Sequence, residues 1–503
     1  MFKKCIPLFV VPLLFVGVTL VDFESSAQFG SDQSGTDEVK LKGGRTIKYT
    51  GYTKDFIKIK KKMLAGDFEG ASKYFEKKEK KVRKKAKGDK LKFYQKMGFL
   101  DLVERGTLDL SRGEFDGSID AFEGAEQVLR IRNTESKAKE KSKAFFGGLL
   151  TSVGINEAAP YYGEAFEQIL MLNGKAVAYL LKGDRLAYNV TRRSIDWQNT
   201  QKVAFDAEQQ KIQRDLEEKK SSGTNPFYDV IERVVWDSYK DLETKAQEVP
   251  SAFVNPFGYY LAGMIQEFES VEDPSLMDNA RISYSKALEL SPKSTVIQQA
   301  YQAMKDGEKA GGRRLVHIIS FDGFTPEKKM MQFKLPLPGG MIIPIKLPIY
   351  QPVSTLVSRT DVTREGKAVA DLDQIASVEA ISLRYQSDQR PKQTLDVLIA
   401  VGISVGKRIA AQGNGFALAA IELSDMKIAP DMRSWMSLPK TISAARFYAT
   451  DGMTSIELNT YDVDGNVLST KTVGIAESGP TFVFVRSMDK QLQAYANQGL
   501  WLN

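Results

Sequence analysis

Two residue types that most metal and nucleophile chemistry requires are almost missing from this sequence. His317 is the one histidine and Cys5 the one cysteine in 503 residues. A zinc site or a His-based triad needs several such partners, and His317 lies in an apolar run typical of a strand. The sequence therefore predicts no catalytic residues, no metal site and no cofactor. His317 is expected to be structural, with a functional role as the alternative.

Carboxylates are the remaining candidates for acid–base chemistry. The chain has 63 Asp and Glu residues, so a hydrolase with paired carboxylates stays an alternative, although no pair stands out from the solvated helix faces. Residues 462–466 (DVDGN) resemble the start of a calcium loop. Glu477 lies beyond position 473, where the closing glutamate of the loop would stand, so the stretch favours a β-hairpin turn.

A run of positive charge covers residues 73–92 and supplies candidate interaction residues. Its densest part contains Lys77, Lys78, Lys80, Lys81, Arg83, Lys84 and Lys85. A cationic helix face can bind phosphate, an anionic lipid headgroup or an anionic glycan. Nucleic acid is not expected as a partner, because few aromatic residues are interleaved with the run. The alternative is a solvated helical linker that binds nothing.

The N-terminus has the pattern of a secretory signal peptide over residues 1–27. Lys3 and Lys4 precede an apolar run at 6–21, and small residues at 25–27 offer a cleavage site before residue 28. An uncleaved anchor is the alternative. Cys5 precedes the apolar run, whereas a lipid-modified cysteine would follow it, so no lipoprotein anchor is expected. The sequence thus predicts an exported, periplasmic protein.

The composition supports a globular mature chain of several domains. Mean hydropathy is −0.29 and 42% of the residues are hydrophobic, which suits a protein with sizeable cores. The formal net charge is +7. Residues 28–50 are rich in Gly, Ser, Thr and Asp, and this composition predicts a flexible leader.

A repeat organises the first half of the mature chain. Residues 66–71 (GDFEGA) return as residues 113–118 (GEFDGS), 47 residues later (113 − 66). In each copy the glycine is expected to end one helix, and the acidic residue to begin the next. Further helix pairs are expected around Gly183 and over 255–292, with a polar helix at 198–220. Residues 51–310 are therefore predicted to form a tetratricopeptide-like α-solenoid, although the repeat exceeds the usual length of about 34 residues.

The composition changes after Gly311 and Gly312, and residues 313–490 are predicted to form an α+β domain with mainly antiparallel strands. Strands are expected at 315–321, 442–447, 454–461, 467–473 and 481–485, and extended strands or a clamp-like loop at 333–352. Helices are expected at 371–383 and 395–411. The apolar stretch 395–421 favours a buried helix, with a membrane hairpin as the alternative. Residues 491–503 are expected to be a tail.

With these elements in place, the chain resembles a family of uncharacterised bacterial exported proteins with N-terminal tetratricopeptide-like repeats and a β-containing C-terminal domain. The most specific match is Arg433-Ser434-Trp435 followed by Leu438-Pro439; others are Tyr161-Tyr162-Gly163, Gly183-Asp184 and residues 482–486. The resemblance implies a cell-envelope protein, often a lipoprotein, with neighbours related to lipoprotein activators of peptidoglycan synthesis. It implies no catalytic residues. This chain departs from the family by lacking the anchoring cysteine.

Together, these observations predict an α+β multidomain protein that is not an enzyme. The expected function is a periplasmic scaffold or adaptor whose helical repeats bind a protein partner in a concave groove. Binding of anionic glycan or lipid headgroups through residues 73–92 is the second hypothesis, and a carboxylate hydrolase the third. Arg433 and Trp435 are further candidate interaction residues, since both residue types are favoured in binding hot spots. The alternative for Trp435 is burial in the domain core.

Overall fold

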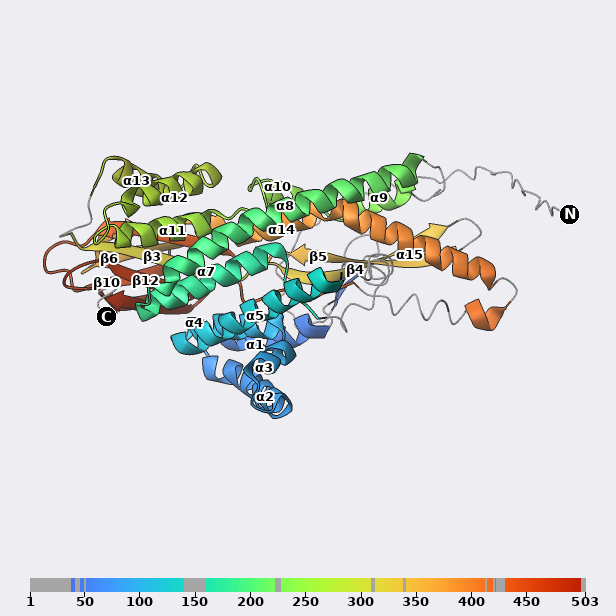
Figure 1. Cartoon of the computed structure of the whole chain (residues 1–503), viewed down its shortest axis with the longest axis horizontal. Helices are drawn as coiled ribbons and strands as arrows, with labels where there is room; N and C mark the ends of the chain where they lie inside the picture. The colour runs from blue at the N-terminus through green and yellow to red at the C-terminus, as the bar shows by residue number, and fades with distance from the viewer. Residues whose placement is uncertain are drawn as a thin grey trace.

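The computed structural model describes the chain in segments that leave out its N-terminus and several internal stretches. The described residues are 38–40, 46–48, 51–139, 160–221, 228–308, 313–337, 341–411, 414–418, 421 and 430–498. The predicted signal peptide and most of the predicted leader lie outside them. In the described residues the N-terminal part is helical and most strands follow it, which makes a mixed α/β fold (Figure 1).

The helical part consists of antiparallel helices in which successive members pack against one another. α4 contacts α5, α5 contacts α7, α7 contacts α8, and α11 contacts both α8 and α12. The helices are α1 (Gly51–Leu64), α2 (Phe68–Ala86), α3 (Lys90–Met97), α4 (Phe99–Ser111), α5 (Phe115–Lys139), α7 (Ala165–Lys182), α8 (Leu186–Ser221), α9 (Tyr228–Asp237), α10 (Glu243–Ala246), α11 (Pro256–Glu269), α12 (Leu276–Leu290) and α13 (Thr295–Lys305).

The glycine breaks predicted from the repeat are confirmed. Gly66, Gly113 and Gly183 have φ values of 77°, 83° and 72°, the left-handed conformation that glycine adopts without a steric penalty. The N–H group of the residue after each glycine donates to the carbonyl five residues earlier, as in a Schellman cap. Asp67 then caps α2 by accepting a hydrogen bond from the Gly70 N–H at 2.8 Å.

Three sheets complete the fold. The central sheet has the order β13-β12-β3-β9-β8, in which only β12 and β3 run parallel. The outer sheet has the order β11-β10-β6-β7, and the hairpin sheet the order β1-β2-β4-β5. The strands are β1 (Glu38–Lys40), β2 (Thr46–Lys48), β3 (Leu315–Asp322), β4 (Glu327–Leu337), β5 (Met341–Gln351), β6 (Arg359–Arg364), β7 (Lys367–Asp371), β8 (Asp373–Ser377), β9 (Thr441–Tyr448), β10 (Ser455–Tyr461), β11 (Val467–Gly474), β12 (Thr481–Met488) and β13 (Gln491–Gln498).

The central sheet is covered on both faces, which explains its continuous apolar strands. In β3, Leu315 and Ile319 join the core shared with the helices. Val316 and Ile318, which point the other way, pack with the outer sheet. The helix surfaces that face the sheet are therefore buried by the chain itself.

A second body extends from this core and is called the arm. It consists of the C-terminal half of α8 with α9, α15 (Arg390–Ala410) and the β4–β5 hairpin, which lie side by side in Figure 1. Ile212, Ile231, Ile345 and Val401 belong to its separate apolar core. α15 packs on one side through Val397, Leu398 and Val401 but exposes Ile409, so the predicted burial of 395–421 is confirmed for one side of this helix only. In the described residues no helix is both long enough and apolar enough to cross a bilayer.

The structure differs from the sequence predictions at three places. β13 occupies most of the predicted tail and pairs with β12 from Met488 to Thr481. β1 and β2 lie in the predicted flexible leader, and β2 pairs with β4. The helix expected at 371–383 begins only with α14 (Val378–Asp388), because the preceding residues form β8 and pair with β9. The β2–β4 and β8–β9 pairs join segments far apart in the sequence, whereas β13 forms a hairpin with the preceding strand β12.

The packing of β13 against the helix ends is a second reason for glycine at these breaks. A Cβ atom added at Gly113 would lie 2.7 Å from Tyr495 Cε1, and one at Gly66 would lie 2.8 Å from Gln491 Oε1. Asn497 of the same strand donates from Nδ2 to the Leu180 carbonyl at 2.7 Å. β13 therefore lies across three helix turns, and the Tyr495 ring leaves no room for a side chain at Gly113, whereas the end of the Gln491 side chain could move aside at Gly66.

Candidate functional site

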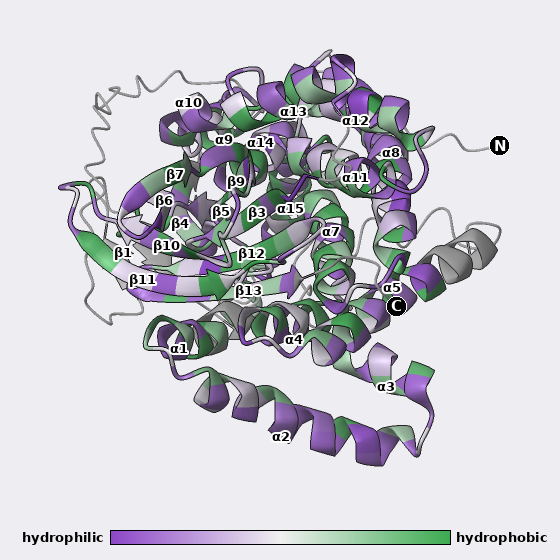
Figure 2. Ribbon diagram, turned by 90° about the vertical axis from the view of Figure 1, so that its left-hand side faces the viewer, coloured by the Kyte–Doolittle hydropathy of each residue, from purple (hydrophilic) through white to green (hydrophobic). Residues whose placement is uncertain are grey.

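The charged run predicted at 73–92 lies mainly on one face of α2, and its last residues belong to the following turn and to α3. Lys73, Lys77, Lys80, Lys81, Lys84 and Lys85 are exposed and are called the cationic face. At the period of an α-helix they span roughly 140° of its circumference and about 18 Å of its length. The opposite side of α2 is buried through Phe75, Val82 and Ala86. Figure 2 shows α2 at the edge of the molecule, below α1 and α4.

The six lysines of the cationic face form no ion pairs within the described part of the chain, although the charge of Lys73 acts on Asp67. The two other predicted members of the run are engaged elsewhere. Lys78 pairs with Asp101 of α4. Arg83 lies 3.7 Å from a carboxylate oxygen of Glu79, with its guanidinium 4.3 Å from the centre of the Phe93 ring.

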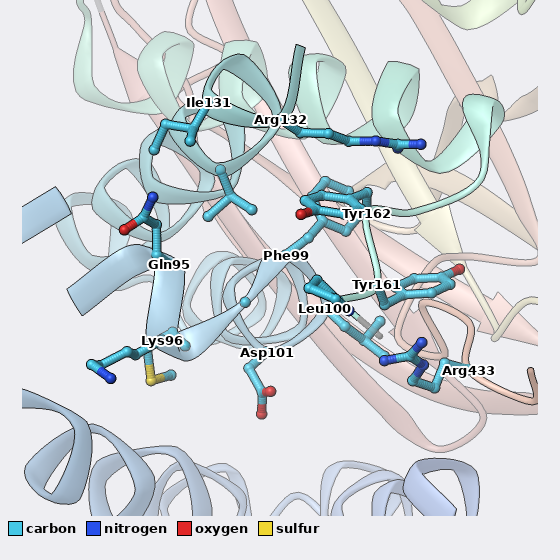
Figure 3. A pocket seen from close by; sticks show the side chains of 14 residues that line it. Gln95, Lys96, Phe99, Leu100, Asp101, Ile131, Arg132, Tyr161, Tyr162 and Arg433 are labelled. Atoms are coloured by element: carbon cyan, nitrogen blue, oxygen red, sulfur yellow. The ribbon is translucent and has the colours of Figure 1, made fainter. Parts of the chain in front are cut away.

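A pocket of about 470 Å³ lies beside this helix, between α3, α4, α5 and the chain before α7. We call it the α3–α5 pocket (Figure 3). Lys78 connects the two features, because its partner Asp101 lines the pocket. Pro160, also in the lining, is the first described residue after 140–159. The volume is within the range of small-molecule sites.

The lining combines aromatic rings with cations. The Arg132 guanidinium lies 4.5 Å from the centre of the Tyr162 ring, and that of Arg433 lies 5.1 Å from the centre of the Tyr161 ring. Lys96 of α3 also lines the pocket, is exposed, and has no ion-pair partner within the described segments. Such a surface favours ligands that carry both negative charge and flat apolar faces.

Close packing fixes the two tyrosines. Gly163 has a φ of 79°, and a Cβ atom there would lie 2.4 Å from Phe99. Only glycine, which has no side chain, fits at this position beside Phe99. The Tyr161 hydroxyl donates to Glu167 Oε2 at 2.6 Å. Glu167 is the N3 residue of the capping box that begins α7.

Two buried carboxylates hold the loop that carries Arg433. Glu167 Oε1 accepts the N–H of Trp435 at 2.7 Å, and Glu104 accepts the N–H groups of Met436 and Ser437 at 2.6 and 3.1 Å. Burial, together with the neighbouring Glu164 charge, raises the pKa of Glu167 to about 7. The loop is therefore fixed to α4 and α7 by hydrogen bonds in the protein interior.

The structure separates the predicted pair Arg433 and Trp435. Trp435 is only 2% exposed, so the indole belongs to the core and not to a surface platform. Its Nε1–H donates to Ser437 Oγ at 2.9 Å and to Thr107 Oγ1 at 3.1 Å. Arg433 is half-buried, pairs with Asp431 at 2.7 Å, and reaches the pocket.

His317 lies in a closed network between α11 and the central sheet. Its Nε2 is 3.2 Å from Glu267 Oε2, and its Nδ1 is 3.1 Å from the Tyr260 hydroxyl. Glu267 also accepts from the Tyr284 hydroxyl at 2.7 Å and from Arg446 Nη2 at 2.6 Å. All four side chains other than Arg446 are fully buried, and Arg446 is 6% exposed. The network holds α11 to the central sheet.

The described residues contain no group of three or more His, Cys, Asp or Glu side chains placed to hold a metal ion. Asp462, from the stretch that resembles a calcium loop, instead accepts from the Asn466 N–H at 2.8 Å. This contact closes the turn between β10 and β11.

Sequence reasoning missed most of the α3–α5 pocket. Lys96, Arg132 and Tyr162 come from three separate segments, and nothing in their spacing indicates a shared site. The one signal in the sequence was the pair of consecutive tyrosines before α7. Two large rings next to a glycine indicate a loop whose backbone packs closely against neighbouring side chains.

Family models, curated proteins and solved structures gave no match to this chain. The family resemblance therefore rests on the sequence residues alone.

Proposed function

We propose that this protein is a non-catalytic binder of an extended anionic ligand and that the cationic face of α2 is its binding surface. The observation that carries the proposal is the set of six exposed lysines on one side of α2, none of which forms an ion pair with another described residue. Such a face destabilises itself by mutual repulsion and is stabilised when a polyanion approaches. The predicted export of the chain makes the cell envelope the proposed location, in the periplasm or at the outer membrane.

Binding by this surface is expected to depend on salt and on the number of lysines. Lys77, Lys80, Lys81 and Lys84 are changed together to glutamine, and binding to polygalacturonate is measured at increasing sodium chloride. The wild-type affinity should fall steeply with salt because counterions are released on binding. The quadruple variant should bind several hundred-fold more weakly at low salt, since each of the four lysines contributes about 1 kcal/mol near an anionic surface.

A control variant carries the same charge change elsewhere. Lys202, Lys211, Lys293 and Lys305 are exposed residues of other segments, and their replacement by glutamine should leave binding near the wild-type value. Equal losses in both variants would show that only net charge matters. Vesicles of phosphatidylglycerol, used in parallel, distinguish a lipid surface from a glycan.

A protein adaptor is the second candidate, and one observation favours it. Large apolar side chains are exposed on the arm, with Trp236 at 53%, Val203 at 70% and Ile409 at 63%. The tetratricopeptide-like character of the helices also remains part of this proposal, supported by their sequential antiparallel packing. The partner groove would differ from the one predicted, because the helix faces toward the central sheet are already covered.

The adaptor candidate predicts that a specific partner depends on these apolar side chains. Val203, Trp236 and Ile409 are changed together to serine, and partners cross-linked in envelope extracts are compared by quantitative mass spectrometry. A partner captured by the wild type should be depleted about tenfold in the variant, as expected when hot-spot residues are lost. Unchanged capture of every protein would contradict the candidate.

A further inference from the structure

We propose that the α3–α5 pocket binds one carboxylate-bearing sugar unit of an acidic glycan, and that it selects this ligand among the polyanions that the cationic face attracts. The inference rests on the proposed function, which it makes more specific. The cationic face supplies long-range attraction without chemical selection. A concave site with few polar groups supplies the selection.

The pocket has groups for both parts of such a sugar. Tyr162 lines the pocket, and aromatic rings are the kind of group that the C–H groups of a pyranose ring contact. The Arg132 guanidinium lies over the same ring, 4.5 Å from its centre. Arg132 has no ion-pair partner in the described part of the chain. A guanidinium can bind a carboxylate through two parallel hydrogen bonds.

The opposite wall gives the pocket a defined shape. Arg433 donates to Asp431 from Nε at 2.9 Å and from Nη2 at 2.7 Å. These hydrogen bonds fix the position of its guanidinium, and Asp431 compensates its charge. Figure 3 shows Arg433 beside Tyr161, and Arg132 above Tyr162. Gln95, on the α3 side of the pocket, has an amide for sugar hydroxyl groups.

The position of the pocket favours a polymer over an isolated sugar. Lys96 lines the pocket and is exposed, and Asp101 of the lining is bound by Lys78 of α2. One residue of an acidic chain can therefore occupy the pocket while its neighbours lie toward the lysines of α2. Linking the two contacts in one ligand raises the affinity beyond that of either contact.

The test compares trigalacturonate with two reference ligands, maltotriose and tripolyphosphate, by isothermal titration calorimetry on the full mature chain. Maltotriose has sugar rings without carboxylates, and tripolyphosphate has charge without sugar rings. We expect trigalacturonate to bind at least tenfold more tightly than either. Arg132→Ala and Tyr162→Ala should each reduce its affinity at least fivefold. Arg130→Ala is the matched control, because Arg130 is on the same helix, pairs with Glu126 and does not line the pocket.

The outcomes separate this inference from the proposed function. If polygalacturonate binds with steep salt dependence but trigalacturonate binds no better than tripolyphosphate, the pocket inference is wrong and the cationic face stands. If the quadruple lysine variant binds polygalacturonate as the wild type does, the proposed role of the cationic face is wrong. If Arg132→Ala and Tyr162→Ala still weaken trigalacturonate binding in that case, the pocket inference is supported. Equal effects of Arg130→Ala and Arg132→Ala would overturn the pocket inference. Circular dichroism and thermal melting of each variant establish that its fold is intact.

Discussion

Replacing Glu267 with alanine is expected to lower the free energy of unfolding by about 3 to 5 kcal/mol. Glu267 is fully buried and is the one carboxylate that Arg446, Tyr284 and His317 all contact. Without it, Arg446 stays in the interior with its charge uncompensated, and two polar partners lose their acceptor. Urea denaturation followed by circular dichroism measures the change.

A surface ion pair provides the control for Glu267. Glu272 and Arg185 lie 2.6 Å apart, with side chains 56% and 51% exposed. Exposed pairs contribute about 0 to 1 kcal/mol, so Glu272→Ala should hardly change the free energy of unfolding. A Glu267→Ala protein as stable as Glu272→Ala would show that the network does not hold α11 to the sheet.

The same network gives stability a defined pH dependence. Burial alone would raise the pKa of Glu267, but His317 and Arg446 together lower it to about 2. Because the folded-state pKa lies below the usual value, the contribution of Glu267 is present above about pH 4.5 and is lost as the pH falls toward 2. In the Glu267→Ala protein this part of the acid sensitivity should be missing.

Trp435→Ala is expected to cost about 3 to 5 kcal/mol of stability, because it leaves a cavity in the interior. Trp435 is 2% exposed and its ring packs against Phe122 with centres 6.0 Å apart. The loop that it anchors carries Arg433, so the variant should also weaken ligand binding in the pocket. Denaturation and titration with trigalacturonate measure the two effects separately.

Trp435→Phe separates packing from hydrogen bonding. Phenylalanine keeps an aromatic ring in the core but lacks the Nε1–H group that donates to Ser437 and Thr107. The expected loss is about 1 to 2 kcal/mol, well below that of alanine. Wild-type stability in Trp435→Ala would contradict the placement of this side chain in the core.

The sequence predicted correctly those helix ends, strands and turns that depend only on the residue types within them. The helix breaks at Gly66 and Gly113 follow from a glycine with an acidic residue after it, and the structure confirms both. The strand at His317 follows from its run of apolar residues, which are buried on both faces of the central sheet. The turn at 462–466 follows from a short polar stretch between two strands. Each depends on backbone preference and burial within a few residues.

The pocket could not be predicted in this way. Lys96 and Arg132 are 36 residues apart (132 − 96), and Arg433 follows 301 residues later (433 − 132). Lys96 and Arg132 meet because α3 packs against α5, and Arg433 joins them because Glu104 and Glu167 hold the loop of Trp435 against α4 and α7. A sequence shows that these carboxylates exist, but their burial, and with it their role, depends on the folded chain.

The helical repeat shows both what the sequence determines and what depends on the tertiary structure. The sequence by itself determined that Gly66 and Gly113 end helices, because only glycine takes the left-handed conformation at no steric cost. Only the tertiary structure decided that the polar residues of β13 would form a strand across these turns, with Tyr495 and Gln491 where a side chain on either glycine would lie. A polar edge strand has little preference of its own, and it forms here because β12 supplies its hydrogen-bond partners.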